Sequence, residues 1–264
     1  MSTPELEFRS FVESNIERAG QDAQLAQMSF DWMCHSGGKY GYSYNFEWLG
    51  RPVIQYPQDT MAMQELVWQT RPDLIIETGI AHGGSLILSA TLLAILDYCD
   101  AAEAGIALDP LKPKRKVIGI DVDIRPHNRI AIEAHPMTHR LEMLQGSSID
   151  PDIVSEVKRR VAGYSRIMVC LDSNHTHAHV LEELKAYAPL VTPECYCVVF
   201  DTVIEDLPKG YFTDRPWDKG NNPRTALYEY LQTHPEFVID RRMDSKLLIT
   251  VAKEGFLRRL PENT

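Results

Sequence analysis

Several features that this sequence lacks narrow the classes of protein to which it belongs. The chain has 264 residues, with 27 Lys and Arg against 37 Asp and Glu, which gives a formal net charge of −10. Recognition of a phosphate backbone needs clustered basic side chains, so we expect no nucleic-acid partner. The five cysteines include no C-x-x-C pair. In a chain of this length they are expected to be reduced, buried thiols.

Targeting and membrane signals are also scarce. No apolar run stands out as long enough to span a bilayer, so we expect no membrane segment. The first eight residues contain neither a basic flank nor an apolar block, which argues against a signal peptide. The hydrophobic fraction of 44% still suffices for one large core, or for a core with a small appendage. We therefore expect a cytoplasmic protein.

From residue 73 onward, short apolar runs alternate with helical patterns, which is typical of a parallel sheet flanked by helices. Strands are expected at 74–77, 116–121, 141–144, 166–172 and 195–201, with late strands near 237–240 and 247–251. Helices are expected at 60–69, with Asp59 as N-cap, at 86–99, from about 125, and at 151–161, 177–187 and 223–231. The predicted fold class is α/β, with a mostly parallel, doubly wound sheet and helices on both faces.

The first part of the chain does not follow this alternation. Residues 1–30 show helical periodicity. Residues 36–48 are rich in glycine and aromatic side chains without a period. This composition suits a lid or substrate wall, or an arm that packs on a neighbouring subunit. We divide the chain into an N-terminal helical arm or lid (1–58) and a cofactor-binding catalytic domain (59–264).

The most informative stretch is a strand, a glycine turn and the start of a helix between Leu74 and Leu86. Its centre reads E-T-G-x-x-x-G-G-S from Glu77 to Ser85. Glycine tolerates positive φ and lets a ligand approach the backbone, and a helix N-terminus presents unpaired N–H groups. Such a turn is a seat for a small polar cofactor.

The spacing of these glycines excludes two common occupants. The dinucleotide fingerprint G-x-G-x-x-G lacks its middle glycine here, and no G-K-[ST] phosphate loop follows. The acidic Glu77 just before the turn suits a ligand that carries an ammonium group, such as S-adenosylmethionine. An ordinary strand–helix turn, or a seat for another nucleotide, remains the alternative.

Acidic residues end four of the predicted strands: Glu77, Asp121, Asp172 and Asp201. In open α/β sheets, ligands bind beyond the carboxyl ends of the strands. A capping or loop role explains any one of these residues, but it explains the four together poorly. The sequence therefore predicts a polar site at this edge of the sheet.

Two loops at that edge suit the nucleoside part of a cofactor. Asp121 is placed to bind both hydroxyls of a ribose, with Asp123 as its competitor. The Gly146-Ser147-Ser148 segment follows the third strand, where an adenine ring would lie, so that Ser147 or Ser148 reaches its edge.

The ends of the next two strands suit a metal ion. Asp172 and Asp201 come from adjacent strands and can hold one hard divalent cation such as Mg²⁺, with a hydroxyl from Thr202 and waters completing an oxygen shell. His175 lies three residues after Asp172 and suits a general base, because the pKa of histidine is near working pH.

Two further histidines in this segment raise zinc as an alternative. His177 and His179 follow His175 at i+2 and i+4. Only His175 and His179 would share a helical face, and no cysteine lies nearby, so a zinc site is disfavoured. We interpret both as exposed helix residues.

At these motifs the sequence resembles the cephalosporin hydroxylase / rhamnosyl O-methyltransferase family of S-adenosylmethionine-dependent methyltransferases. The matching segments are residues 76–85, 117–123, 171–175, 216–226 and 255–260, within a likeness that covers about residues 50–260. The resemblance implies a Rossmann-like methyltransferase fold, similar to that of the catechol-type, Mg²⁺-dependent O-methyltransferases.

The resemblance also implies roles for single residues. It puts Glu77 and Gly79 near the methionine end of the cofactor, Asp121 on its ribose, Asp172 and Asp201 on the metal, and His175 at the catalytic base. The predicted cofactor-binding set is Glu77, Gly79, His82, Gly83, Ser85, Asp121, Ser147, Ser148 and Asp172; the predicted metal ligands are Asp172, Asp201 and Thr202; the predicted catalytic residues are His175 and Asp172. The chain departs from the family at Ser147, where relatives often have aspartate, and at Thr202, where many have a second acidic or amide ligand.

The predicted function is metal-assisted O-methylation of a sugar or glycosylated natural product. Tyr211, Trp217 and Arg224 are candidate substrate contacts, with packed loop anchors as the plain alternative. Other readings are N-methylation of an amino sugar, a non-catalytic accessory protein that keeps the cofactor pocket, and a nucleotide-dependent oxidoreductase. Family likeness favours a homo-oligomer.

Overall fold

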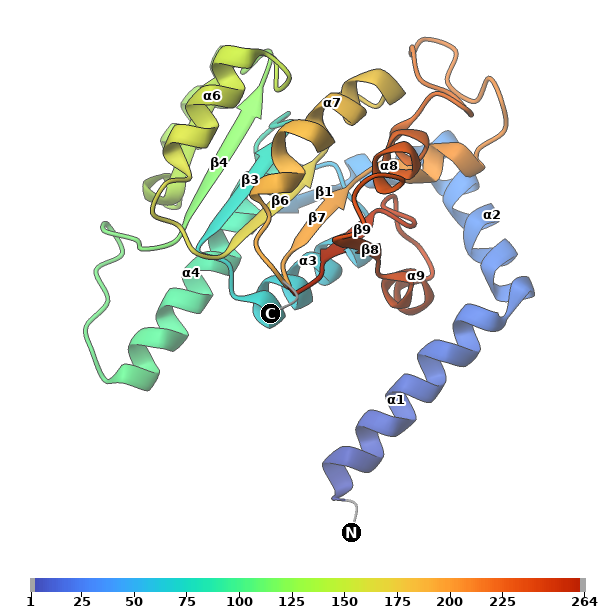
Figure 1. The fold of residues 1–264 in the computed structure, drawn as a ribbon, viewed down its shortest axis with the longest axis horizontal. Coiled ribbons are helices and arrows are strands. Elements are labelled where there is room, and N and C mark those ends of the chain that lie inside the picture. The colour runs from blue at the N-terminus through green and yellow to red at the C-terminus, as the bar shows by residue number, and fades with distance from the viewer. Residues whose placement is uncertain (1–2, 262–264) are drawn as a thin grey trace.

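The centre of the fold is a mostly parallel sheet (Figure 1). The computed structural model describes residues 3–261, and within them the main sheet has seven strands in the order β5-β4-β3-β6-β7-β9-β8. The strands are β3 (Leu74–Thr78), β4 (Lys116–Asp121), β5 (Leu141–Gln145), β6 (Ile167–Leu171), β7 (Tyr196–Val199), β8 (Phe237–Ile239) and β9 (Phe256–Arg259). Only β9 runs antiparallel to its neighbours. The strand order reverses between β3 and β6, which is where such sheets bind ligands.

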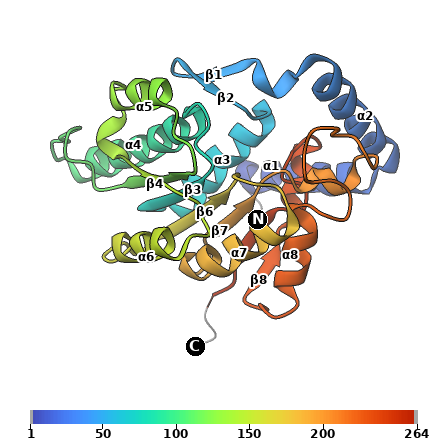
Figure 2. The same ribbon diagram turned by 90° about the horizontal axis from the view of Figure 1, so that it is seen from above.

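Helices cover both faces of this sheet, as the view in Figure 2 shows. One face carries α3 (Pro57–Thr70), α4 (Gly84–Ala104) and α5 (Pro126–Glu133); the other carries α6 (Pro151–Arg160), α7 (His177–Tyr187) and α8 (Pro223–Leu231). Side chains alternate along each strand, so Ile75 packs in the core under α3 and α4, while Leu74 and Ile76 pack in the core under α7 and α8. Burial on both faces is why these strands are continuous apolar runs.

The N-terminal part lies outside this layered arrangement. α1 (Pro4–Gln21) and α2 (Ala23–Tyr40) are separated at Asp22, whose side chain accepts from the N–H of Leu25 and caps α2. α1 packs against α9 (Arg241–Leu247), and Glu13 forms an ion pair with Arg242, while the first turns of α1 extend beyond the rest of the fold (Figure 1). β1 (Phe46–Trp48) and β2 (Arg51–Val53) form a hairpin that contacts α4.

The predicted α/β fold class is confirmed, and several element bounds are corrected. The helix predicted for residues 1–30 breaks at Asp22, and α2 continues to Tyr40, so the first part of the aromatic stretch 36–48 is helical. The rest of that stretch is a short 3₁₀ turn and β1. Residues 1–2 of the predicted arm and 262–264 of the predicted domain lie outside the described residues. The division at 58/59 stays a prediction.

The strand predicted at 247–251 is wrong. α9 ends at Leu247, and Leu248 adopts φ +61, a left-handed conformation that cannot continue a strand. The last strand of the sheet is β9 instead, at Phe256–Arg259.

Asp59 is not the N-cap of α3, which begins after Tyr56. The Asp59 side chain is buried, accepts from the Thr250 hydroxyl, and accepts from the N–H of Val251 at 3.2 Å. Burial raises the pKa of Asp59 to about 7. This carboxyl group fastens the segment before β9 to α3.

Two compositional expectations also need adjustment. The 21-residue α4 is long and apolar enough to cross a membrane by length and composition, contrary to the expectation from the sequence. Of its most apolar window, 56% is buried inside the protein, as in the core helix of a sheet protein, so this is weak evidence for a span. Three cysteines are buried as expected, whereas Cys34 and Cys99 are partly exposed; all five are free thiols.

Candidate active site

A cleft of about 900 Å³ opens where β3, β6 and β7 end. The loops after these strands line it, the loop after β7 as far as Trp217, together with residues of α2 and of the segment between β2 and α3. The cleft therefore lies beside the reversal of strand order, where the sequence predicts a polar site. Of the predicted residues, it brings together Gly79, His82, Ser85, Asp172, His175, Asp201, Tyr211 and Trp217.

Gly79 begins the turn after β3 with φ +89. A Cβ atom at this position would overlap the backbone oxygen of Asp172, so only glycine lets the ends of β3 and β6 lie this close. Ala81 in the same turn has φ +45, which is uncommon for a residue with a side chain. Strained backbone of this kind clusters at ligand-binding turns.

Glu77 lies beneath this turn and is only 4% exposed. The Ser89 hydroxyl donates to its Oε1 atom. Burial raises the pKa of Glu77 to about 7, although hydrogen bonds from Ser89 and Ser85 act in the opposite direction. The carboxyl group lines a small pocket that adjoins the cleft at Gly79 and Ser85.

Asp121 is fixed beside the turn by backbone hydrogen bonds. Its Oδ2 accepts from the N–H groups of Ile80 at 2.8 Å and Ala81 at 3.1 Å, and its Oδ1 accepts from that of Asp123 at 2.9 Å. These bonds orient a carboxylate next to the seat in which the sequence predicts a ribose. The competitor Asp123 is exposed and has no such anchor in the turn.

The helix that follows the turn begins at two more glycines. Gly83 is the N-cap of α4 at φ +84, and it does not line the cleft. His82 does line it, and its carbonyl oxygen accepts from the Arg51 guanidinium. Gly83 shapes the turn, and its predicted contact with the cofactor stays a prediction.

Ser148 lies outside the cleft, and its contact with adenine stays a prediction. Ser148 is 4% exposed and does not line the cleft. Its hydroxyl lies 3.0 Å from Nε2 of His179, and its carbonyl oxygen accepts from the Tyr187 hydroxyl. Ser147 is partly exposed, and its contact with adenine stays a prediction.

His179 is not the exposed residue that the sequence suggested. Its side chain is 18% exposed, and Nε2 also lies 3.2 Å from the Ser173 hydroxyl, which donates to the fully buried Glu183 at 2.7 Å. This cluster ties the loop after β6 to α7. The i, i+4 spacing of His179 and Glu183 was the one signal for it in the sequence. His177 instead contacts Thr225 of α8.

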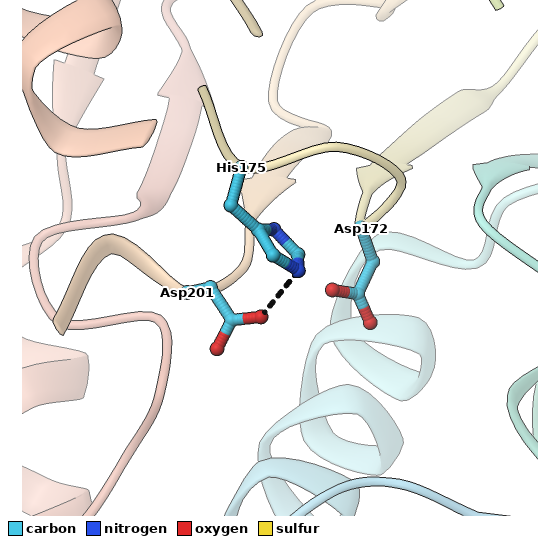
Figure 3. A group of neighbouring side chains, drawn as sticks. All are labelled: Asp172, His175 and Asp201. Atoms are coloured by element: carbon cyan, nitrogen blue, oxygen red, sulfur yellow. Dashed lines mark ion pairs between the residues drawn. The ribbon is translucent and has the colours of Figure 1, made fainter. Parts of the chain in front are cut away.

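Asp172, His175 and Asp201 converge in the cleft (Figure 3). Each offers one ligand atom, and these three atoms lie within 4.8 Å of one another. Nε2 of His175 is 3.0 Å from Oδ2 of Asp201. Asp201 itself has φ +55, a strained conformation for a residue with a side chain. The short β7 and the turn after it bring this carboxylate to face the end of β6.

The charges of this cluster fit a divalent cation. Burial, and then the charges of Asp201 and Glu77, raise the pKa of Asp172 well above its ordinary value. A cation between the two carboxylates would remove that repulsion, and carboxylate oxygens are the ligands that Mg²⁺ prefers. The imidazole of His175 offers the third of the three neighbouring ligand atoms.

Thr202, the predicted third ligand, is corrected. Its side chain is fully buried, and its hydroxyl donates to the carbonyl oxygens of Val251 and Lys253, the latter at 2.6 Å. It holds the segment before β9 and does not face the cleft. The position next to Asp201 in the sequence could not reveal this, because its partners lie about fifty residues away.

Tyr211 and Trp217 line the cleft from the loop after β7. The Trp217 ring meets the His175 ring edge-on, with centroids 4.6 Å apart, and the Arg215 guanidinium lies over the Trp217 ring. The Tyr211 hydroxyl donates to the carbonyl oxygen of Cys34 in α2 at 3.3 Å. Trp217 thus borders the base candidate, and Tyr211 also anchors the loop.

Arg224, the third predicted substrate contact, does not line the cleft. It is 5% exposed and pairs with Asp206 and Glu254. This ion pair fastens α8 to the loop after β7, so the loop-anchor alternative holds for this residue.

Comparison with known proteins adds to this geometry. Residues 40–260 match the sequence model of the family described as Rhamnosyl O-methyltransferase/CmcI. A protein named rhamnosyl O-methyltransferase from Mycobacterium tuberculosis is 28% identical over 246 residues, which cover 90% of this chain and 89% of the relative. One of the same name from Mycobacterium leprae is 26% identical, with 80% and 82% covered.

Solved structures of CmcI share the fold. A CmcI structure with Mg and SAM has a TM-score of 0.54 at 21% identity, covering 84% of this chain and 81% of the other. The apo form of CmcI has a TM-score of 0.55 at 23% identity, with 84% and 80% covered. The Rossmann-like methyltransferase fold predicted from the sequence is thereby confirmed.

Proposed function

Because the chain belongs to the Rhamnosyl O-methyltransferase/CmcI family and is a methyltransferase, we propose that it methylates a hydroxyl of a sugar or glycoside, with S-adenosylmethionine as donor and a hard divalent cation such as Mg²⁺ at Asp172 and Asp201. The curated relatives are named for a rhamnosyl acceptor, and a CmcI structure was solved with Mg and SAM. The observation that carries the proposal is the convergence of Asp172, His175 and Asp201 in a cleft that also contains the Gly79 turn.

The chain's own residues have separate tasks in this reaction. The turn at Gly79 and the anchored carboxylate of Asp121 bind and orient the donor. When bound, S-adenosylmethionine supplies an electrophilic methyl group and Mg²⁺ lowers the pKa of a neighbouring hydroxyl. His175 takes the proton of that hydroxyl, and the Trp217 ring packs against the imidazole.

Alignment of the donor methyl group with the acceptor hydroxyl provides the remaining rate enhancement. Effective concentrations gained by holding two reactants in line correspond to several kcal/mol of the barrier. The Gly79 turn and the Asp172, His175 and Asp201 cluster both follow strand ends of one sheet, which suits this role. Trp217 and Tyr211 offer the aromatic surface on which a sugar ring packs.

A methyl-transfer assay tests this function. The protein is incubated with S-adenosylmethionine, MgCl₂ and a panel of rhamnosides, other glycosides and amino sugars, and methylated products are identified by mass spectrometry. We expect O-methylated sugar, and we expect EDTA to abolish it and excess Mg²⁺ to restore it. N-methylated product would move the acceptor to an amine. Cofactor binding without any product would favour an accessory protein.

A further inference from the structure

Gln55 has a buried polar atom with no partner in the described part of the chain. The residue is 5% exposed and lies between β2 and α3, in the segment that the sequence assigned to the N-terminal arm or lid. Its Oε1 atom forms no hydrogen bond. Leaving a carbonyl oxygen buried and unpaired costs about 1–3 kcal/mol, so a ligand group that donates to it would be favoured at this place.

The surroundings of this atom indicate what kind of group that is. Gln55 lines both the main cleft and the small pocket beneath the glycine turn, whose polar lining also includes Glu77, Ser85 and Asp172. The small pocket has a volume of about 10 Å³. This is about the space of one water-sized group. Its size and its acceptor-rich lining suit a small cationic donor such as an ammonium group, whereas a carboxylate would be repelled by Glu77 and Asp172.

The segment that carries Gln55 is held rigidly against the cofactor turn. Arg51 donates to the carbonyl oxygen of His82 through Nε at 3.0 Å and to Oδ1 of Asn128 at 3.0 Å. On the other side, a Cβ atom at Gly84 would overlap the backbone of Pro52, so glycine permits β2 to lie directly on the start of α4. These two contacts fix the position of Gln55 before any ligand binds.

We propose that Gln55 is a cofactor-binding residue whose Oε1 accepts a hydrogen bond from the ammonium group of the amino-acid end of S-adenosylmethionine, opposite the Glu77 carboxylate. This inference rests on the proposed function and extends it to a residue outside the sheet domain. An ammonium group beside Glu77 would favour the charged form of that carboxyl group and so offset the cost of its burial. The N-terminal segment then contributes to the donor site and not only to a lid.

The test compares two ligands by calorimetry. S-adenosylhomocysteine carries the amino-acid end, and 5′-methylthioadenosine lacks it. In Gln55→Met, which removes the carbonyl oxygen and keeps the length of the side chain, we expect affinity for S-adenosylhomocysteine to fall on the order of 10-fold to 100-fold, as for loss of a hydrogen bond to a charged group. Affinity for 5′-methylthioadenosine should stay at the wild-type value.

The chain offers a matched control. Gln58, the second residue of α3, also has a buried Oε1 without a partner in the described residues but lines neither pocket. Gln58→Met should leave both affinities unchanged. An unchanged affinity of Gln55→Met for S-adenosylhomocysteine, or an equal loss for both ligands, would overturn the proposal; the first result would assign the small pocket to water.

A measurement on the unaltered protein guards against misfolding of the variant. The desamino analogue of S-adenosylhomocysteine should bind on the order of 10-fold to 100-fold more weakly than the parent compound. Equal binding of the two would show that no ammonium seat exists. If the wild-type protein binds neither S-adenosylhomocysteine nor 5′-methylthioadenosine, the proposed function fails and not merely the role of Gln55.

Discussion

The two sides of the cleft are built differently. The side assigned to the donor consists largely of backbone: Gly79 and Gly84 at close approaches, and N–H groups that hold Asp121. The side assigned to the acceptor consists of side chains from α2 and the loop after β7, among them Tyr211 and Trp217. A backbone seat tolerates little substitution. A wall of side chains can change its shape without disturbing the sheet, so we infer that acceptor specificity is determined there.

The largest expected effect comes from the point where the two sides meet. His175→Ala should lower kcat by about 10²- to 10⁴-fold, the range for loss of a positioned general base, while S-adenosylhomocysteine binding measured by calorimetry persists. His177→Ala, two residues along and in contact with Thr225 of α8, is the matched control and should retain activity. Full activity of His175→Ala would remove the base assignment, and a parallel loss of Mg²⁺ affinity would make His175 a ligand.

The substitution Gly79→Ala tests whether the donor side of the cleft depends on the close approach of two backbone segments. The new Cβ atom meets the Asp172 carbonyl and the position keeps φ +89, so we expect the free energy of unfolding to fall by about 4 kcal/mol from left-handed strain and overpacking together. Urea unfolding measures this. Gly105→Ala, with φ +63 and no atom within 4 Å of the added Cβ, should lose only about 1 kcal/mol. Equal losses would show that the close approach is unimportant.

Glu77 makes the stability of the folded protein depend on pH. Burial raises its pKa from 4.5 to about 7 in the folded protein, so the folded state holds a proton that the unfolded state releases. Its contribution to stability is full below pH 4.5 and is lost as pH rises through 7, by on the order of 3 kcal/mol. Relative to Glu77→Gln, the cofactor-free wild type should therefore lose stability over this range.

Denaturant unfolding at pH 4.5, 6 and 8 follows this loss. Glu182→Gln changes an exposed glutamate of α7 and should show no comparable trend. A constant difference between wild type and Glu77→Gln across the pH series would contradict the assigned burial effect.

The smallest effect is expected on the acceptor side. Trp217→Ala removes an aromatic contact worth about 1 kcal/mol, so KM for the sugar should rise about 5-fold while the donor affinity stays unchanged. Trp217→Phe keeps a ring beside His175 and should recover most of the loss. A rise in the Kd for S-adenosylhomocysteine instead would place Trp217 with the donor.

Local pattern in the sequence was sufficient to place the glycine turn and the acidic strand ends at one edge of the sheet. The strand, the glycine turn and the acidic strand ends are short-range features, and Asp172 and Asp201 meet because parallel strands end at one edge. Family resemblance supplied the roles of the residues, and the family and fold are confirmed.

Errors arose where a role depends on partners far along the chain. Thr202 bonds to Lys253, and Arg224 pairs with Glu254. Nothing near these residues in the sequence distinguishes a buried fastening from a ligand contact. The place of Gln55 in the same small pocket as Glu77 could not be predicted either, because it follows from the packing of β2 on α4.

The left-handed backbone of Asp201 has a consequence for how this site can change in evolution. At φ +55, glycine would have less backbone strain than any residue with a side chain. Exchange for glycine would relax the turn and also delete one of two mutually repelling negative charges. Stability alone therefore favours loss of the carboxylate at this position.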